Sequence, residues 1–291
     1  MEQSENISCP NCGSQENTPF LMVKDHFLSK EDFGLLKCNS CNLIFTGNRP
    51  GIEKIGDYYK STDYVSHSST KKGIVNRAYN MVRNYTLGKK VKLISSLVSG
   101  TNLLDIGAGT GHFLKRANDE GFTVLGLEPD EDARRVAGEI NNVELLPLES
   151  LSSLGHGKFD AITMWHVLEH VFHLNAELET IIAALKKDGV LVIAVPNYSS
   201  FDASYYKEFW AAYDVPRHLY HFSPEVIIKL VEEKGLKFEK MEPMKFDSYY
   251  VSMLSEKYRG GSIFNAMRVG LLSNMKASNG SYSSQIYIFR K

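Results

Sequence analysis

A glycine-rich turn between a strand and a helix constrains the fold of this chain more than any other feature. It reads Leu104-Asp105-Ile106-Gly107-Ala108-Gly109-Thr110-Gly111, with an apolar strand pattern over 102–106 before it and an amphipathic helix pattern over 112–120 after it. Glycines let the backbone turn tightly and approach a ligand, and a helix N-terminus presents free N–H groups to that ligand. The turn therefore predicts a binding site at the carboxyl end of a strand; a turn with no ligand is the alternative.

Strand and helix patterns alternate along the rest of the chain. Strands are predicted over 102–106, 123–127, 143–146, 159–164 and 190–195, and helices over 112–120, 131–140 and 176–185. Ser223 as N-cap and Pro224 at the first helical position begin another helix, and 236–242 and 284–290 have the pattern of two final strands. This alternation predicts an open α/β sheet with helices on both faces and insertions at 197–222 and 247–279.

The spacing of the glycines separates two classes of cofactor. A dinucleotide-binding turn has the pattern G-x-G-x-x-G, but the third position here is His112, and Gly111 comes one residue early. Glu128 ends the second strand of the pattern, where a carboxylate can accept hydrogen bonds from ribose hydroxyls. A nucleoside-containing ligand other than NAD is therefore favoured, and a dehydrogenase is the weakest interpretation.

The turn resembles motif I of class I S-adenosylmethionine (SAM)-dependent methyltransferases. The resemblance continues in KFDAITMWHVLEHV (158–171) and LKKDGVLVIAVPN (185–197), and covers residues 100–200. It implies a Rossmann-like methyltransferase sheet, an enzyme, and SAM as cofactor. The residues that it places at SAM are Asp105, Gly107, Ala108, Gly109, Gly111, Glu128, Pro129, Glu149, Trp165 and His166. For Glu149 a solvated surface acid is an equal alternative.

All four cysteines lie near the N-terminus as two pairs, Cys9-x-x-Cys12 and Cys38-x-x-Cys41, with 25 residues between them. Two thiolate pairs can hold one tetrahedral zinc ion in a closed structural site, and a ribbon of this size needs the metal to fold. Disulfides, an iron–sulfur cluster and unrelated thiols are the alternatives.

The predicted domains are a zinc ribbon at 1–47, a linker and helical lid at 48–98, and a SAM-binding domain at 99–291. A ribbon followed by this core resembles a bacterial group of small-molecule methyltransferases that includes sugar C-methyltransferases.

Histidines gather at two places that are suited to a methyl acceptor. If the acceptor is a hydroxyl or an acidic carbon, a general base removes its proton, and histidine is the usual base near neutral pH. His166, Glu169 and His170 have spacing i, i+3, i+4, which resembles a divalent-metal arrangement of quinone O-methyltransferases whose first position is Glu. Support of the local turn is the alternative for Glu169 and His170.

The second place is 210–222, where aromatic residues surround Asp214, Arg217, His218 and His221. The catalytic candidates are His166, His218 and His221, with His218 as the first choice for the base; an aromatic loop that packs on the sheet is the alternative.

Three further segments have two or more interpretations. Tyr58, Tyr59 and Tyr64 form a lid over SAM or a docking strip for the ribbon, and Tyr249, Tyr250 and 264–272 cap the pocket, form a homodimer face or pack in the core.

Charge and hydropathy limit the partners. Lys plus Arg number 33 against 34 Asp plus Glu, and 1–47 is acidic, which disfavours an electrostatic grip on nucleic acid. The apolar run at 190–195 is too short to cross a bilayer, and the polar N-terminus does not resemble a secretory signal. These limits indicate a cytoplasmic protein, and the resemblance implies an enzyme that O- or C-methylates a sugar, a quinol or phenol, or a secondary metabolite. The alternatives are an RNA or protein methyltransferase that uses the ribbon, and a non-catalytic SAM-binding scaffold.

Overall fold

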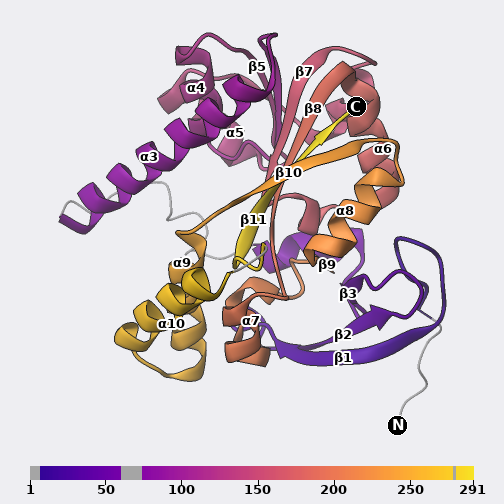
Figure 1. Ribbon diagram of the computed structural model, residues 1–291, viewed down its shortest axis with the longest axis vertical. Coiled ribbons are helices and arrows are strands. Elements are labelled where there is room, and N and C mark those ends of the chain that lie inside the picture. The colour runs from indigo at the N-terminus through magenta and orange to yellow at the C-terminus, as the bar shows by residue number, and fades with distance from the viewer. Residues whose placement is uncertain (1–6, 60–73, 278–279) are drawn as a thin grey trace.

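The computed structural model describes residues 7–59, 74–277 and 280–291, and its centre is a seven-stranded mixed sheet (Figure 1). The strand order is β10-β11-β8-β7-β4-β5-β6. The strands are β4 (Asn102–Ile106), β5 (Thr123–Leu127), β6 (Leu145–Leu146), β7 (Phe159–Trp165), β8 (Leu185–Pro196), β10 (Lys237–Pro243) and β11 (Ser284–Arg290). Strands β4 to β8 pair in parallel, whereas β11 is antiparallel to both of its neighbours. The predicted Rossmann-like α/β sheet is confirmed.

Helices cover both faces of this sheet, as predicted. One face packs against α3 (Ile74–Leu97), α4 (His112–Asp119) and α5 (Glu131–Asn141), and the other against α6 (Leu174–Ala184) and α8 (Pro224–Glu232). Leu103 packs in the core beneath α3, α4 and α5, and Leu104 packs in the core beneath α6 and α8. Successive side chains of a strand point to opposite faces of the sheet. The run Val190–Val195 is fully buried, and each such aliphatic side chain contributes about 1.5–3 kcal/mol of transfer free energy.

Several element boundaries differ from the prediction. Helix α6 begins at Leu174 rather than 176, because Leu174 itself is buried in the core. Strand β8 starts at Leu185, which pairs with Phe159 before the regular register resumes. Strand β6 is confined to two residues, the pair that reaches β5. Helix α8 begins as predicted, with the Ser223 hydroxyl accepting from the Val226 N–H.

The N-terminal region forms a second, four-stranded sheet. Its strands are β1 (Asn17–Lys24), β2 (Asp32–Cys38), β3 (Ile44–Thr46) and β9 (Tyr220–His221), in that order. Strand β9 comes from the insertion at 197–222, so this distant segment completes the sheet. Cys9, Cys38 and Phe45 share one hydrophobic core with Leu104 of the main sheet. The ribbon expected over 1–47 therefore shares both a sheet and a core with the rest of the chain.

The two insertions lie beside this ribbon, at the lower end of the main sheet in Figure 1. They form α7 (Phe201–Tyr206), the 3₁₀ turns η5 (Lys207–Phe209) and η6 (Ala211–Tyr213), and the hairpin of α9 (Asp247–Arg259) and α10 (Ile263–Lys276). The buried carboxylate of Asp202 ties them together by accepting from Trp210 Nε1, Ser273 Oγ and Ser283 Oγ. Of the stretch 264–272, only part is in the core. Helix α10 exposes Ile263, Phe264, Met267, Leu271 and Met275.

The linker contributes the short helices α1 (Ile52–Ile55) and η1 (Gly56–Tyr59) before α3. Tyr64, a predicted lid residue, lies outside the described residues. Helix α3 packs its inner face on the sheet, with Val91 and Ile94 fully buried. Among the helices that the structure describes, none combines the length and the apolar character needed to cross a membrane.

Candidate active site

The glycine turn leaves an open cradle at the carboxyl end of β4. The N–H groups of Gly107 and Ala108 donate to the Leu127 carbonyl over 2.8 and 3.0 Å, so the turn is fastened to β5. Gly107 has φ +70°, and a Cβ there would meet Val167 at 2.4 Å. Gly109 has φ +54°, and a Cβ there would meet no atom within 4 Å. The turn is thus packed on one side, at Gly107, and has free space on the other, at Gly109.

Asp105 lies directly before the cradle and is almost completely buried. Its Oδ1 accepts from Thr163 Oγ1 over 2.6 Å. Burial raises the pKa of Asp105 to about 7, although the Thr163 hydrogen bond and the positive charge of Lys90 oppose this. Lys90 reaches in from α3 with its Nζ 4.0 Å from the Trp165 ring centroid, and burial lowers its pKa to about 8. A carboxylate and an ammonium group therefore flank the cradle.

Glu128 is the second carboxylate at the cradle. Its Oε2 accepts from the Gly109 N–H over 2.8 Å, and its Oε1 accepts from the Asp130 N–H over 3.0 Å. Burial raises the pKa of Glu128, while these two N–H donors oppose the rise. Pro129 and Glu149, which were predicted at the same ligand, are exposed.

His166 follows β7 with a left-handed backbone, φ +58°, and its side chain is one-third exposed. Its Nδ1 lies 3.3 Å from Glu169 Oε1, and its Nε2 lies 3.1 Å from Asp247 Oδ2 on α9. Burial on its own lowers the pKa of His166, but the hydrogen bonds to Asp247 and Glu169 outweigh it and raise the pKa to about 10. His166 is therefore an imidazolium at neutral pH that donates from both nitrogens.

Glu169, His170 and His218 form a separate cluster, in which one ligand atom from each residue lies within 4.8 Å of the others. His170 Nδ1 lies 3.0 Å from the Arg217 carbonyl, and His218 Nδ1 lies 2.9 Å from the Ala212 carbonyl. Since a carbonyl only accepts, each Nδ1 carries a proton and donates it to that carbonyl. The buried Oε2 of Glu169 has no hydrogen-bond partner among the described residues.

This cluster corrects the metal trio expected from the spacing. The predicted trio was His166, Glu169 and His170, but both nitrogens of His166 already contact carboxylates. His218 takes its place, from a segment that is remote in sequence. Burial, with a contribution from the nearby His218, lowers the pKa of His170 to about 4, so its ring is neutral. A neutral imidazole beside a carboxylate can help to hold a divalent cation or accept a proton.

His221, the third catalytic candidate, contacts the ribbon. Its Nε2 lies 3.3 Å from Thr46 Oγ1, and its backbone pairs with Ile44. The side chain is buried, and burial followed by the nearby His218 lowers its pKa to about 3. The glycine turn is not among its contacts in the described part of the chain.

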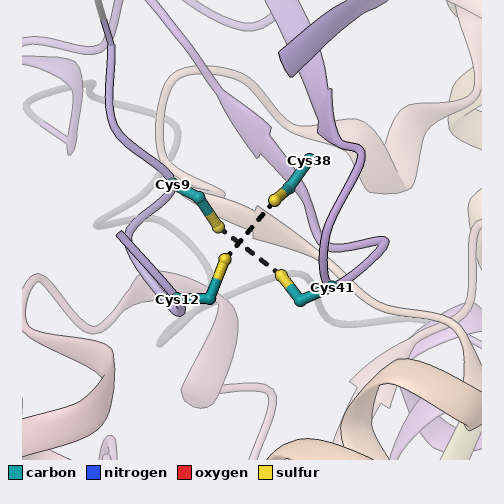
Figure 2. Close-up of side chains that lie close together, drawn as sticks. All are labelled: Cys9, Cys12, Cys38 and Cys41. Atoms are coloured by element: carbon teal, nitrogen blue, oxygen red, sulfur yellow. Dashed lines mark hydrogen bonds between the residues drawn. The ribbon is translucent and has the colours of Figure 1, made fainter. Parts of the chain in front are cut away.

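The four cysteines come together as the spacing predicts (Figure 2). Cys9 Sγ lies 3.6 Å from Cys41 Sγ, Cys12 Sγ lies 3.5 Å from Cys38 Sγ, and none of the four forms a disulfide. A tetrahedral zinc with Zn–S bonds of about 2.3 Å needs sulfur–sulfur distances of roughly 3.8 Å. The cluster therefore has the donors and the size for one structural zinc ion.

Sequence reasoning missed four residues of this region. Lys90, Thr163 and Asp247 contact the predicted site residues Trp165, Asp105 and His166, and Asp25 pairs with Arg217. Each reaches its partner from another element, so local spacing carries no signal for it. The position of Thr163 on the strand beside β4 is the one hint available, because neighbouring parallel strands bring facing side chains together.

Comparison with known proteins agrees with this geometry. A methyltransferase domain family matches residues 79–240, which is more than half of the chain. The ubiquinone biosynthesis O-methyltransferase of Rickettsia bellii is 23% identical over 202 residues, covering 63% of this chain and 82% of the relative. An uncharacterized methyltransferase of Alkaliphilus oremlandii is 32% identical over 103 residues, covering 33% of this chain and 46% of the relative.

Solved structures show the same fold. The magnesium protoporphyrin IX methyltransferase of Synechocystis, solved with bound SAH, superposes with a TM-score of 0.54 at 16% identity, covering 83% of this chain and all of that one. A SAM-dependent methyltransferase of Archaeoglobus fulgidus gives a TM-score of 0.50 at 19% identity, covering 72% of this chain and 94% of that one. With the family match, the open glycine cradle and the sheet order, the chain belongs to the methyltransferase domain family and is a SAM-dependent methyltransferase.

Proposed function

We propose that this enzyme transfers the methyl group of SAM to an oxygen or an acidic carbon of a small molecule. The observation that carries the proposal is the open space at Gly109, with the carboxylates of Asp105 and Glu128 beside it. When bound, SAM supplies an electrophilic methyl group on a sulfonium. The protein's task is then to align the acceptor, exclude water and accept a proton.

The SAM site combines the backbone from Gly107 to Gly111 with three charged side chains. Glu128 keeps free lone pairs on both oxygens, which suits the two ribose hydroxyls. Asp105 suits the amino group of the methionine part, and Lys90 suits its carboxylate. The interaction between these two groups supports the assignment, because the positive charge of Lys90 stabilises the Asp105 carboxylate. Contacts of SAM with Ala108, Pro129, Glu149, Trp165 and His166 stay predictions.

His218 is the residue that we assign as general base. Its Nδ1–H is held by the Ala212 carbonyl, so Nε2 is the nitrogen that can take a proton. His166 cannot do this as an imidazolium. Because both of its N–H groups contact carboxylates, we assign it instead to holding α9 against the segment after β7. A positioned base contributes about 10²–10⁴-fold to the rate of such transfers. His221 contacts Thr46 and is assigned to support of the loop.

A phenolic hydroxyl is the first acceptor to test. The Rickettsia relative is named a ubiquinone biosynthesis O-methyltransferase, and a phenol is acidic enough for a histidine base. Sugars are the second class to test, because a ribbon followed by this core resembles a group that includes sugar C-methyltransferases. An RNA acceptor is disfavoured by the excess of acidic residues in 1–47.

A screen with methyl-labelled SAM tests the proposal. The purified chain is incubated with catechol, a quinol, sugar nucleotides, bulk RNA and total protein, and the label in each fraction is measured. We expect label in a small molecule only, and much less of it with His218→Ala. Label in RNA or protein would instead favour a macromolecular acceptor. SAM binding with no transfer to any fraction would favour a scaffold.

A further inference from the structure

A buried ion pair joins the ribbon to the segment that carries His218, which we call the acceptor loop (residues 210–222). Arg217 Nη2 lies 3.0 Å from Asp25 Oδ1 of the ribbon and 2.7 Å from Asp214 Oδ1 of the loop itself. The side chains of Arg217 and Asp25 are 3% and 0% exposed. Phe27 of the ribbon covers the guanidinium, with its ring centroid 4.7 Å from Cζ. This contact between distant segments is therefore dry and strongly charged.

Asp25 also caps a turn of the ribbon, in addition to its ion pair with Arg217. It begins the turn between β1 and β2 and caps it by accepting from the N–H groups of Phe27, Leu28 and Ser29. These donors would be enough to hold the turn, because they occupy both carboxylate oxygens. The turn is thus capped without Arg217. We therefore expect the ion pair with Arg217 to matter for the acceptor loop rather than for the turn.

A second ribbon residue holds the backbone at the predicted base and at the residue that follows it. Thr46 Oγ1 donates to the His218 carbonyl over 2.8 Å, and the Thr46 N–H donates to the Leu219 carbonyl over 3.0 Å. Strand β3 then pairs with β9 directly after His218. The Leu219 N–H also donates to the Glu169 carbonyl over 2.7 Å, so the loop is held between the ribbon and the segment that follows β7.

We propose that Asp25 and Thr46 are positioning residues that hold His218 in register for the acceptor, so that the ribbon is a structural part of the acceptor site. This inference rests on the proposed role of His218. It gives the cysteine cluster a consequence beyond ribbon stability: Cys9 and Cys38 lie in the core that backs Leu219 and Tyr220. We therefore expect a change at Asp25 or Thr46, which contact the acceptor loop directly, to disturb the acceptor site more than the SAM cradle.

The test compares Asp25→Asn and Thr46→Val with Asp32→Asn, an exposed acid on the same hairpin that pairs only with Lys24 in the described structure. The first readout is ¹⁵N NMR of histidine-labelled full-length protein, with the His218 signals assigned by their loss in His218→Ala. The parent should show a single Nδ1–H tautomer. Both ribbon variants should show averaged signals, and Asp32→Asn should match the parent. His218 signals that match the parent in Asp25→Asn and Thr46→Val would overturn the proposal.

Kinetics with catechol as the probe acceptor give the second readout. We expect kcat to fall on the order of tenfold in Asp25→Asn, with SAM affinity and zinc content unchanged, because a small displacement of a reacting group is costly. In the His218→Ala background, Asp25→Asn should cause no further loss. A full additional loss there would mean a general structural defect and would contradict the positioning role.

Two outcomes separate this inference from the proposed function. Normal turnover in His218→Ala would remove His218 as base, while the NMR readout, which needs no acceptor, would still report on the ribbon contact. Loss of turnover in His218→Ala with normal turnover in Asp25→Asn and Thr46→Val would refute the positioning role alone. If Asp25→Asn loses zinc or folds poorly, Thr46→Val decides, because it removes one hydroxyl and keeps the shape of the side chain.

Discussion

His166 Nε2 lies 3.1 Å from Asp247 Oδ2, and this contact joins the end of β7 to the first turn of α9. With Glu169 on the other nitrogen, it holds the pKa of His166 at about 10. The insertion at 247–279 thus sets the protonation state of a residue in the predicted site.

The first prediction concerns the pH dependence of this contact. The folded-state pKa of His166 is raised above the unfolded value of about 6.5. Its stabilising contribution is therefore complete below pH 6.5 and is lost as the pH rises toward 10. Asp247→Asn should destabilise the protein by about 1 kcal/mol at pH 6, a value reduced for the partial exposure of the ring, and by much less at pH 10. Urea unfolding at the two pH values measures the difference. Asp132→Asn, at an exposed acid of α5, is the control, and an equal loss at both pH values would argue against the imidazolium.

The second prediction concerns the cradle. Gly109→Val should abolish SAM binding, because valine disfavours φ +54° and its side chain fills the open space. Asp105→Ala should weaken SAM binding by at least tenfold through loss of a buried carboxylate. Titration calorimetry with SAM and SAH measures both.

Gly138→Ala is the matched control for the cradle. Gly138 lies in α5, and a Cβ there would meet no atom within 4 Å. Alanine in a helix interior should stabilise the protein by up to about 1 kcal/mol and leave SAM affinity unchanged. SAM binding at parental strength in Gly109→Val would show that the ligand lies elsewhere.

The third prediction concerns zinc. The purified protein should contain one zinc ion per chain, and Cys38→Ser should lose it. Because Cys38 is buried in the shared core, the melting temperature should fall by roughly 5 °C or more, at about 2–4 °C per kcal/mol for a domain of this size. Elemental analysis and thermal unfolding test this, with Ser40→Ala as the control. Unchanged zinc content in Cys38→Ser would refute the four-cysteine site.

The fourth prediction concerns the base. His218→Ala should lower kcat by about 10²–10⁴-fold and leave SAM affinity within twofold. His156→Ala, at an exposed histidine between η3 (Leu148–Ser153) and β7, should behave like the parent enzyme. Stopped transfer together with lost SAM binding in His218→Ala would point to a folding defect, and normal transfer would exclude His218 as base.

Local sequence pattern was enough to predict the strands of the central sheet and the glycine turn after β4. Strand β4, strand β5 and the start of α8 match the prediction because each depends on periodicity or on a cap within a few residues. The glycines of the turn and the acids Asp105 and Glu128 lie at the ends of these strands, so their positions follow from the same pattern. The two cysteine pairs lie together, as their spacing predicts.

Tertiary contacts decided how the two histidine groups are divided. Spacing placed His166 with Glu169 and His170, yet Asp247 of α9 engages His166, and His218 joins the other two. Likewise, no local pattern indicated that β9 would complete the ribbon sheet or that Asp25 would meet Arg217. These contacts join residues far apart in the chain, and their partners are selected by burial and charge compensation once the sheet has brought the segments together.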